Sequence, residues 1–255
     1  MSTPEFKLRE LQPADSAAVG RLITDFGGDL TTHFQVDPYN AIVHGTENET
    51  TGVVVEKPDV DGLIGMGTLR FGNIQFNGEV LPFAFLDGLK VKEEFRGNGL
   101  GTQIAQWRVQ KTRERFGENV VIATGMLYDN YASHAVGSKW CREFLEAASN
   151  VLIIPTRNRP PGKVSGVEVR ELGQNEYEEF AGKQNKFYSQ YNFYPPSSPA
   201  SIAHALNVVA DGRKPYCYYV AVDVHGNSTR RGVNVGAWAV KNPIGSMNYP
   251  QRCEQ

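Results

Sequence analysis

The stretch with the most evident chemistry runs from Leu86 to Thr102, where three glycines fall within five residues. An apolar strand pattern precedes the glycines, and an amphipathic segment that reaches Phe116 follows them. The amides of a helix's first turn have no partners inside the helix and carry the positive end of its dipole, so this strand–glycine–helix order is typical of phosphate binding. Glycines allow close approach of the backbone to a ligand, and Arg96 adds a fixed positive charge beside them. The stretch therefore predicts a site for a phosphorylated ligand.

Two familiar phosphate-binding patterns do not fit the spacing of these glycines. A dinucleotide fingerprint, G-x-G-x-x-G, needs a third glycine at the position of Thr102. It also needs an acidic residue at the end of the next strand, which instead ends in Thr124-Gly125. A P-loop needs Gly-Lys-Ser/Thr, which does not follow here. The pattern that does fit is R-x-x-G-x-G, formed by Arg96, Gly99 and Gly101.

This pattern, after Leu89-x-Val91, resembles the acetyl-CoA pyrophosphate loop of the GNAT superfamily of N-acetyltransferases. The resemblance implies that acetyl-CoA is the cosubstrate and that a primary amine of a small molecule or peptide is the acceptor. In the family, backbone amides at the end of the preceding strand hold the carbonyl and the pantetheine, and the loop holds the pyrophosphate. An asparagine that opens the next helix often touches the cofactor. The implied cofactor-binding residues are Leu89, Val91, Arg96, Gly97, Asn98, Gly99, Leu100, Gly101, Thr102 and Asn130. The alternatives are a glycine-rich helix start without a ligand and, for Asn130, a simple N-cap.

The resemblance does not identify the general acid or the general base. The family often has a tyrosine about seven residues after that asparagine, which reprotonates the leaving thiolate, and this position holds Gly137. Tyr128, near the strand end, is the candidate substitute, with an exposed loop tyrosine as the alternative. Asp87, in the strand that leads to the loop, is the candidate base through a water, because a carboxylate inside an apolar strand can have a raised pKa. A hydrogen-bonded structural role is the alternative for Asp87.

Composition and charge exclude several other classes of protein. The chain has 255 residues, 40% apolar and 21% charged, which suits one or two globular domains. A net charge of −2 without Lys/Arg runs argues against a nucleic-acid surface. The scattered Cys141, Cys217 and Cys253 favour a reducing compartment and form neither a zinc site nor a disulfide framework. There is no signal peptide pattern and no apolar run of membrane-spanning length. We therefore expect a cytoplasmic protein with no metal, nucleic-acid or membrane partner.

The elements that must position the loop follow from the apolar periods. Asn77-Gly78 is the strongest turn signal, because Asn-Gly favours the type I′ turn of a β-hairpin. It predicts an antiparallel meander whose last strand leads to the glycines. The strand after the helix must lie parallel to that strand, since a strand–helix–strand unit crosses over to a parallel neighbour. Strands are expected at 6–11, 51–56, 63–71, 80–91, 119–124 and 151–154, and helices at 17–26, 101–116 and 131–139.

This order agrees with the α/β (α+β) fold of the GNAT superfamily, a mixed sheet with an antiparallel N-terminal meander and a parallel strand pair at the cofactor site. In that fold the parallel strands splay apart and the pantetheine passes between them. Residues 1–158 are therefore expected to form a GNAT acetyltransferase domain, with a linker of turn-forming composition at 156–166. Only residues 29–50 show no clear period, and a second helix is the one suggestion there.

After the linker the early pattern begins again. Val167–Leu172 repeats the first strand, and a helix is expected at 177–188. The likeness stops before any counterpart of the glycine loop, and the tail 241–255 has turn composition. We therefore expect 165–255 to be a partial GNAT-like unit that lacks the acetyl-CoA loop. Its strand edges and aromatic side chains predict that it packs on the first unit or on another chain, as in a homo-oligomer.

Three functions from different classes remain. An acetyl-CoA-dependent N-acetyltransferase is favoured. A non-catalytic acyl-CoA-binding module is suggested by Gly137 and by the shortened second half, and a nucleotide-binding protein is disfavoured by the loop spacing. Release of free thiol from acetyl-CoA in the presence of an amine separates the first two.

Overall fold

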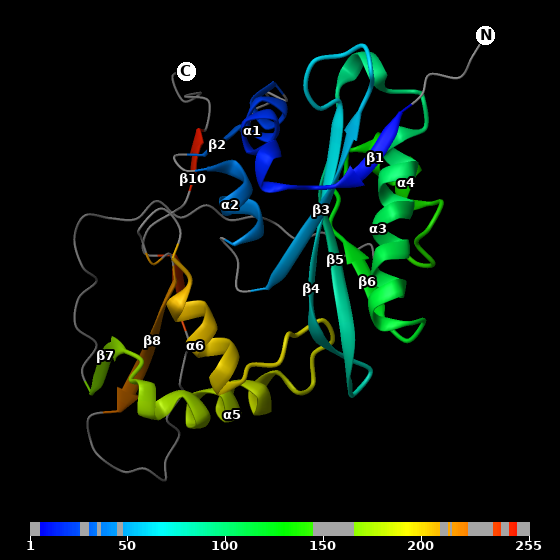
Figure 1. Ribbon diagram of the computed structural model, residues 1–255. Coiled ribbons are helices and arrows are strands. Elements are labelled where there is room, and N and C mark those ends of the chain that lie inside the picture. Colours follow the sequence, from blue (N-terminus) through cyan, green and yellow to red (C-terminus); the bar gives the residue numbers. More distant parts are fainter. Residues whose placement is uncertain are drawn as a thin grey trace, which may run out of the picture.

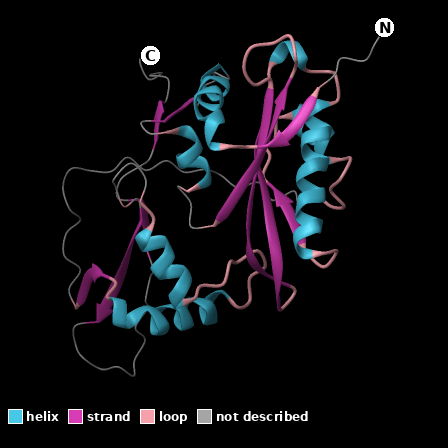
Figure 2. Cartoon of the chain, viewed as in Figure 1, coloured by secondary structure: helices cyan, strands magenta, loops and turns pink. Residues whose placement is uncertain are grey.

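The computed structural model describes residues 6–25, 31–34, 37–44, 48–144, 166–209, 214, 216–223, 237–240 and 245–248. The strand expected at 151–154, most of the expected linker, and Cys253 lie outside these residues. Within them, a five-stranded sheet with helices on both faces forms the larger part of the protein (Figure 1). A smaller three-stranded sheet with two helices follows in the second half (Figure 2).

The large sheet is mixed, as the sequence predicts. Its strands, in spatial order, are β1 (Lys7–Glu10), β3 (Glu49–Glu56), β4 (Gly65–Phe76), β5 (Glu79–Val91) and β6 (Val121–Thr124). Neighbours run antiparallel except β5 and β6, which are parallel. The predicted parallel neighbour is confirmed, and it arises because the chain crosses over between the two strands through helix α3 (Leu100–Phe116).

The turn between β4 and β5 is the predicted type I′ turn. Asn77 and Gly78 have φ of 51° and 83°, the two positive values that this turn requires. Phe76 pairs with Glu79 across the turn. The local Asn-Gly signal therefore sets the register of the two longest strands of the sheet.

Helices cover both faces of this sheet. Helices α1 (Ser16–Asp25) and α2 (Pro38–Val43) lie on one face, and α3 and α4 (Tyr131–Gly137) lie on the other (Figure 1). The expected helices at 17–26, 101–116 and 131–139 are thus present within one or two residues of their predicted bounds.

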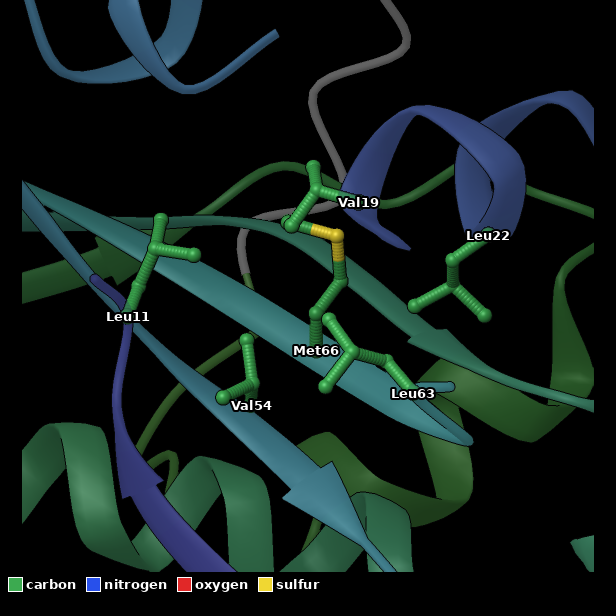
Figure 3. Packing of buried hydrophobic residues seen from close by; sticks show 6 residues of the cluster. All are labelled: Leu11, Val19, Leu22, Val54, Leu63 and Met66. Atoms are coloured by element: carbon green, nitrogen blue, oxygen red, sulfur yellow. The ribbon is translucent and has the colours of Figure 1, made fainter. Parts of the chain in front are cut away.

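The cores on the two faces explain the apolar run of β3. Val54 packs on the α1 face, where Val19 and Leu22 of α1 lie over Met66 of β4 (Figure 3). Val53 and Val55 point the opposite way and pack against α3. Because successive strand residues face opposite sides, a strand covered by helices on both faces must be apolar throughout.

Two segments differ from the expectation. Residues 29–50 contain a short strand, β2 (Thr31–Phe34), in addition to the helix α2. The tail, expected to hold only turns, contains the strand β10 (Gly245–Asn248), which pairs antiparallel with β2. The two strands are short and lie far apart in the chain, so neither leaves a local period that the sequence could reveal.

The second half has a sheet of its own. Its strands, in spatial order, are β7 (Val167–Glu171), β8 (Tyr216–Asp223) and β9 (Ala237–Val240). Helices α5 (Tyr177–Tyr188) and α6 (Pro199–Asn207) accompany the sheet. A small core of Leu172, Phe180, Ala181, Ile202 and Val220 joins them.

Both halves begin with the same arrangement of a strand, one 3-10 turn and a helix. Arg9 of β1 donates both terminal nitrogens to the carboxylate of Asp15, at 2.7 and 2.6 Å. Arg170 of β7 does the same to Glu176, at 2.6 and 2.6 Å. Each carboxylate also accepts the amide three residues before it, at 2.8 and 2.9 Å. A partial repeat over the whole second half stays a prediction.

The ion pair of Glu176 makes the free energy of unfolding depend on pH. The Arg170 guanidinium and then the Gly173 amide lower the pKa of Glu176 from 4.5 to about 2. A carboxyl with a lowered folded-state pKa contributes stability above its unfolded pKa, and this contribution disappears as the pH falls through the folded pKa. We therefore expect the urea concentration at the midpoint of unfolding to decrease as the pH is lowered from 4.5 to about 2. In Glu176→Gln this decrease with pH should be smaller. The matched control is Glu179→Gln, which loses only an exposed pair with Lys183. An unchanged slope in Glu176→Gln would contradict the expectation.

The second half contacts the first at the tip of the β4–β5 hairpin. Gln75 N donates to Tyr194 O at 2.8 Å, and Phe193 N donates to Gln75 O at 2.8 Å, which forms an antiparallel bridge. Asn77 N donates to Asn192 Oδ1 at 2.8 Å. Figure 1 shows the loop after α5 beside this end of the hairpin. The contact therefore combines backbone and side-chain hydrogen bonds with the paired rings of Phe76 and Phe193, whose centroids lie 5.3 Å apart.

Candidate active site

The glycine loop joins β5 to α3 through the short 3-10 turn Glu93–Phe95. Gly97 and Gly99 have φ of 80° and 76°, a left-handed backbone that residues other than glycine rarely adopt. Gly99 is the N-cap of α3, and the first intrahelical bond runs from Gln103 N to Gly99 O, at 3.1 Å. The three residues between them therefore have amides without an intrahelical acceptor. The loop has the geometry that a phosphate site needs.

The glycines of the loop differ in their surroundings. A Cβ on Gly97 would meet nothing within 4 Å, and one on Gly99 would meet only Gln103 Nε2, at 4.0 Å. Both therefore face open space from which a ligand can approach. A Cβ on Gly101 would lie 3.1 Å from Val136 Cγ2 of α4. Gly101 thus lets α3 and α4 pack closely, whatever it contributes to the predicted cofactor contact.

Two cationic side chains flank the loop. Arg96, the predicted one, is exposed, and its Nε donates to Val91 O at 3.2 Å. Asn98 Nδ2 donates to the backbone of the 3-10 turn at 3.1 Å, which holds the loop in shape. Lys139 was not predicted: its Nζ donates to Thr102 Oγ1 at 3.0 Å and brings a second positive charge to the first turn of α3. A single lysine after the end of α4 carries no sequence signal of this proximity.

A bulge in β5 lies immediately before the loop. Met66 pairs with Lys90 and Thr68 pairs with Asp87, so residues 88–89 of β5 oppose a single residue of β4. The pairing of β5 with β6 ends at Leu86, two residues before this bulge. Beyond that point, no strand among the described residues pairs with the β6-facing edge of β5. The backbone of Leu89 and Val91 belongs to this unpaired stretch, and a bulge turns such a strand away from its neighbour.

Asp87, the candidate base, lies at the start of the bulge. Its carboxylate accepts Arg70 Nη2 at 3.0 Å and Gly88 N at 2.8 Å. Arg70 in turn lies over the ring of Phe85, 5.1 Å from its centroid. The structural alternative thus describes the contacts of Asp87 well. Even so, 54% of the side chain is accessible to solvent, so the carboxylate is fixed in position and still open to contact with a water.

The turn from β6 into α4 carries the other predicted residues. Tyr128, the candidate acid, is 92% exposed. Asn130 is the N-cap of α4, with Oδ1 accepting Ser133 N at 3.0 Å, so the capping alternative holds and a cofactor contact stays a prediction. A Cβ on Gly137 would lie 2.5 Å from Met126 Cε. A tyrosine at this position would have to displace Met126, which gives a physical reason for the departure from the family pattern.

The described ranges contain no group of three or more His, Cys, Asp or Glu side chains that could hold a metal ion. Cys141 and Cys217, the cysteines within these ranges, are free thiols. None of the helices described here is long and apolar enough to span a membrane.

Comparison with known families gives the class of the protein. Residues 21–139 match the profile of the acetyltransferase (GNAT) family. The matched stretch contains β3 to β6, the bulge, the glycine loop, α3 and α4. The chain therefore carries a GNAT acetyltransferase domain at residues 21–139, and the protein is an enzyme of the acetyltransferase class.

Several solved structures are similar in fold. An acetyltransferase from Trypanosoma brucei is 14% identical, with a TM-score of 0.48, over 58% of this chain and 100% of that chain. Glucosamine-6-phosphate N-acetyltransferase from Arabidopsis thaliana is 13% identical, with a TM-score of 0.42, over 61% and 99%. An aminoglycoside acetyltransferase from an uncultured soil sample is 14% identical, with a TM-score of 0.46, over 59% and 97%. No curated protein matches the chain significantly.

Proposed function

We propose that this protein transfers an acetyl group from acetyl-CoA to a primary amine of a small molecule or peptide. The observation that carries the proposal is the junction of the bulged β5 with the glycine loop. Among the described residues, the β6-facing edge of β5 has no partner strand beyond Leu86, and through the turn Glu93–Phe95 it leads into a helix start whose glycines face open space. An extended thioester arm can lie along this edge while its pyrophosphate meets the amides of the loop.

Positive charge favours the pyrophosphate at this place. Arg96 lies before the loop, and Lys139 lies against Thr102 in the first turn of α3. The positive end of the helix dipole points to the same region. Three independent sources of positive potential thus converge on the open glycines, and the site suits a polyanionic cosubstrate.

The reaction is a direct attack of the neutral amine on the thioester carbonyl. The C–N bond forms and the C–S bond breaks, while the amine loses a proton and the CoA thiolate gains one. We assign the amides of Leu89 and Val91 to the oxyanion, and binding the two reactants in line lowers the entropic barrier. Asp87 takes the amine proton through a water, and Tyr128 is assigned to donate a proton to the CoA thiolate. Cytoplasmic location remains part of this proposal.

The decisive experiment is an amine panel with detection of free thiol. Thiol release that requires both acetyl-CoA and one class of amine supports the proposal, and mass spectrometry should find the amine heavier by one acetyl group. A second function, a non-catalytic acyl-CoA-binding module, is favoured by Gly137, which stands where the family often has the tyrosine that protonates the thiolate. Tight acetyl-CoA binding without thiol release over the whole panel would favour that module instead.

Arg96→Ala is expected to weaken acetyl-CoA binding more than it slows bound chemistry. A charge-assisted hydrogen bond to the pyrophosphate contributes about 1.5–3 kcal/mol, which corresponds to a rise in Kd of about 10- to 150-fold. Isothermal calorimetry measures this directly. The matched control is Arg113→Ala, an exposed arginine in the last turn of α3 whose described ion pair is with Glu118. Equal dissociation constants for parent and Arg96→Ala would remove Arg96 from the site.

We expect one acetyl-CoA per chain. The R-x-x-G-x-G pattern does not recur after Trp238. At the strand-to-helix junction after β7, Gly173 N donates to the Glu176 carboxylate at 2.9 Å, so a carboxylate already lies where a phosphate would bind. Calorimetric titration of the full chain should saturate at one equivalent, and Gly99→Val should remove that equivalent. Saturation at two equivalents, or one equivalent left in Gly99→Val, would contradict this expectation.

A further inference from the structure

Arg108 is a buried cation in the middle of α3. Only 3% of the residue is exposed, and burial lowers the pKa of its guanidinium to about 10, so it stays charged at neutral pH. All of its hydrogen bonds that the structure resolves go to backbone carbonyls. Nε donates to Ile104 O at 3.3 Å, and Nη1 donates to Thr68 O at 3.0 Å and to Asp87 O at 2.9 Å. Burying a charge is costly unless it is well hydrogen-bonded, so the hydrogen bonds to these carbonyls are what stabilise the buried guanidinium.

The two carbonyls on Nη1 belong to the last regular pair before the bulge. Thr68 and Asp87 face each other across β4 and β5, and the register shifts immediately after them. One nitrogen of Arg108 therefore ties the two strands together where their ladder is interrupted. Asp87 is held both by its backbone, whose carbonyl accepts from Arg108, and by its carboxylate, which accepts from Gly88 N and Arg70 Nη2.

Gly67, the single residue that opposes the bulge, makes room for this arrangement. A Cβ there would lie 2.7 Å from Ile104 Cγ2 and 3.0 Å from Arg108 Cζ. The bare backbone of Gly67 thus forms the surface on which the guanidinium lies. Gly88, in the bulge itself, has φ of 60°, and a Cβ there would lie 3.2 Å from Thr68 Oγ1. Gly67, Gly88 and Arg108 together hold the bulge in one conformation.

We propose that Arg108 is a positioning residue for acetyl transfer. Its guanidinium fixes the bulge, and through it the backbone of Leu89 and Val91 and the carboxylate of Asp87. This inference rests on the proposed function, because these groups are the ones assigned to the thioester and to the amine proton. It adds that their geometry depends on a side chain that touches neither substrate. A misplacement of about 1 Å at a reacting centre can lower the rate about 100-fold.

The test compares kcat/KM for acetyl-CoA in variants of the full chain, well below their melting temperatures. Arg108→Met keeps the length of the side chain and removes its donors, and we expect kcat/KM to fall about 100-fold. Arg108→Lys keeps the charge and can reach one carbonyl, so it should recover part of the loss. Thr112→Val removes a buried hydroxyl that donates to Arg108 O at 2.9 Å, one turn further along the helix. This control should lower Tm and leave kcat/KM as in the parent. Arg113→Met, the same change at an exposed position of α3, should alter neither.

The outcomes separate the two proposals. A parent protein that neither binds acetyl-CoA nor releases thiol overturns the proposed function, whatever Arg108 does. An active parent with an Arg108→Met variant that loses only Tm overturns the positioning role. If Arg108→Met does not fold, Arg108→Lys and Gly67→Ala decide. Parent-like kcat/KM in both variants overturns the inference, and a reduced value in either, with Thr112→Val unaffected, supports it.

Discussion

Gly99→Val is expected to abolish acetyl-CoA binding while the fold survives. At φ of 76°, a β-branched residue costs about 1–3 kcal/mol of backbone strain, which a typical domain tolerates. The new side chain would occupy the open space in front of the loop amides. Losing two charge-assisted hydrogen bonds of about 1.5–3 kcal/mol each raises Kd about 100-fold or more. Calorimetry should detect no saturation at concentrations that saturate the parent.

The control for this strain lies at the other end of the same helix. Gly117, the C-cap of α3, also has φ of 76°, and a Cβ there would meet nothing within 4 Å. Gly117→Val should lower Tm at least as much as Gly99→Val and leave the dissociation constant unchanged. A folded Gly99→Val protein that binds acetyl-CoA like the parent would show that the loop is structural.

Asp87→Asn is expected to lower kcat by about 10²–10⁴-fold, the contribution typical of a general base. Asparagine keeps the shape of the side chain and an oxygen that can accept from Arg70 or from Gly88 N, but it cannot take the amine proton. The KM for acetyl-CoA should therefore change little. Steady-state kinetics measure both constants.

A carboxylate far from the site serves as the control for Asp87. Glu79 lies at the opposite end of β5, in the hairpin turn, and Glu79→Gln should keep the parent kcat. Tyr128→Phe, measured in the same assay, tests the group assigned to the thiolate. Parent-like kcat in Asp87→Asn would move the base to another residue and leave Asp87 with its hydrogen-bonding role alone.

The parts of the fold that sequence predicts are those set by local backbone chemistry. Asn77-Gly78 predicts its turn because both residues adopt positive φ at little cost. The glycines at 97 and 99 predict a loop of the same backbone type before α3. The parallel pairing of β5 with β6 follows from a short strand–helix–strand connection. Each signal lies within a few residues of its effect.

The features that sequence does not predict depend on contacts between distant residues. An arginine in an amphipathic helix is expected on the solvent side, and Arg108 is buried only because a glycine and a bulge lie beneath it. Lys139 meets Thr102 across two helices, 37 positions apart in the chain. The pairing of β2 with β10 joins segments near opposite ends of the sequence. None of these contacts produces a periodic pattern.

By itself, the sequence determined the class of this protein, because the order of strand, R-x-x-G-x-G loop and helix defines where a pyrophosphate can meet free amides. Tertiary structure decided how the reacting groups are held. The bulge lies where β4 and β5 differ by one residue in register, and Arg108 meets Gly67 and the carbonyls beside the bulge only when α3 packs on the sheet. Backbone preferences act over a few residues and can be found in a sequence, whereas close packing depends on which surfaces meet.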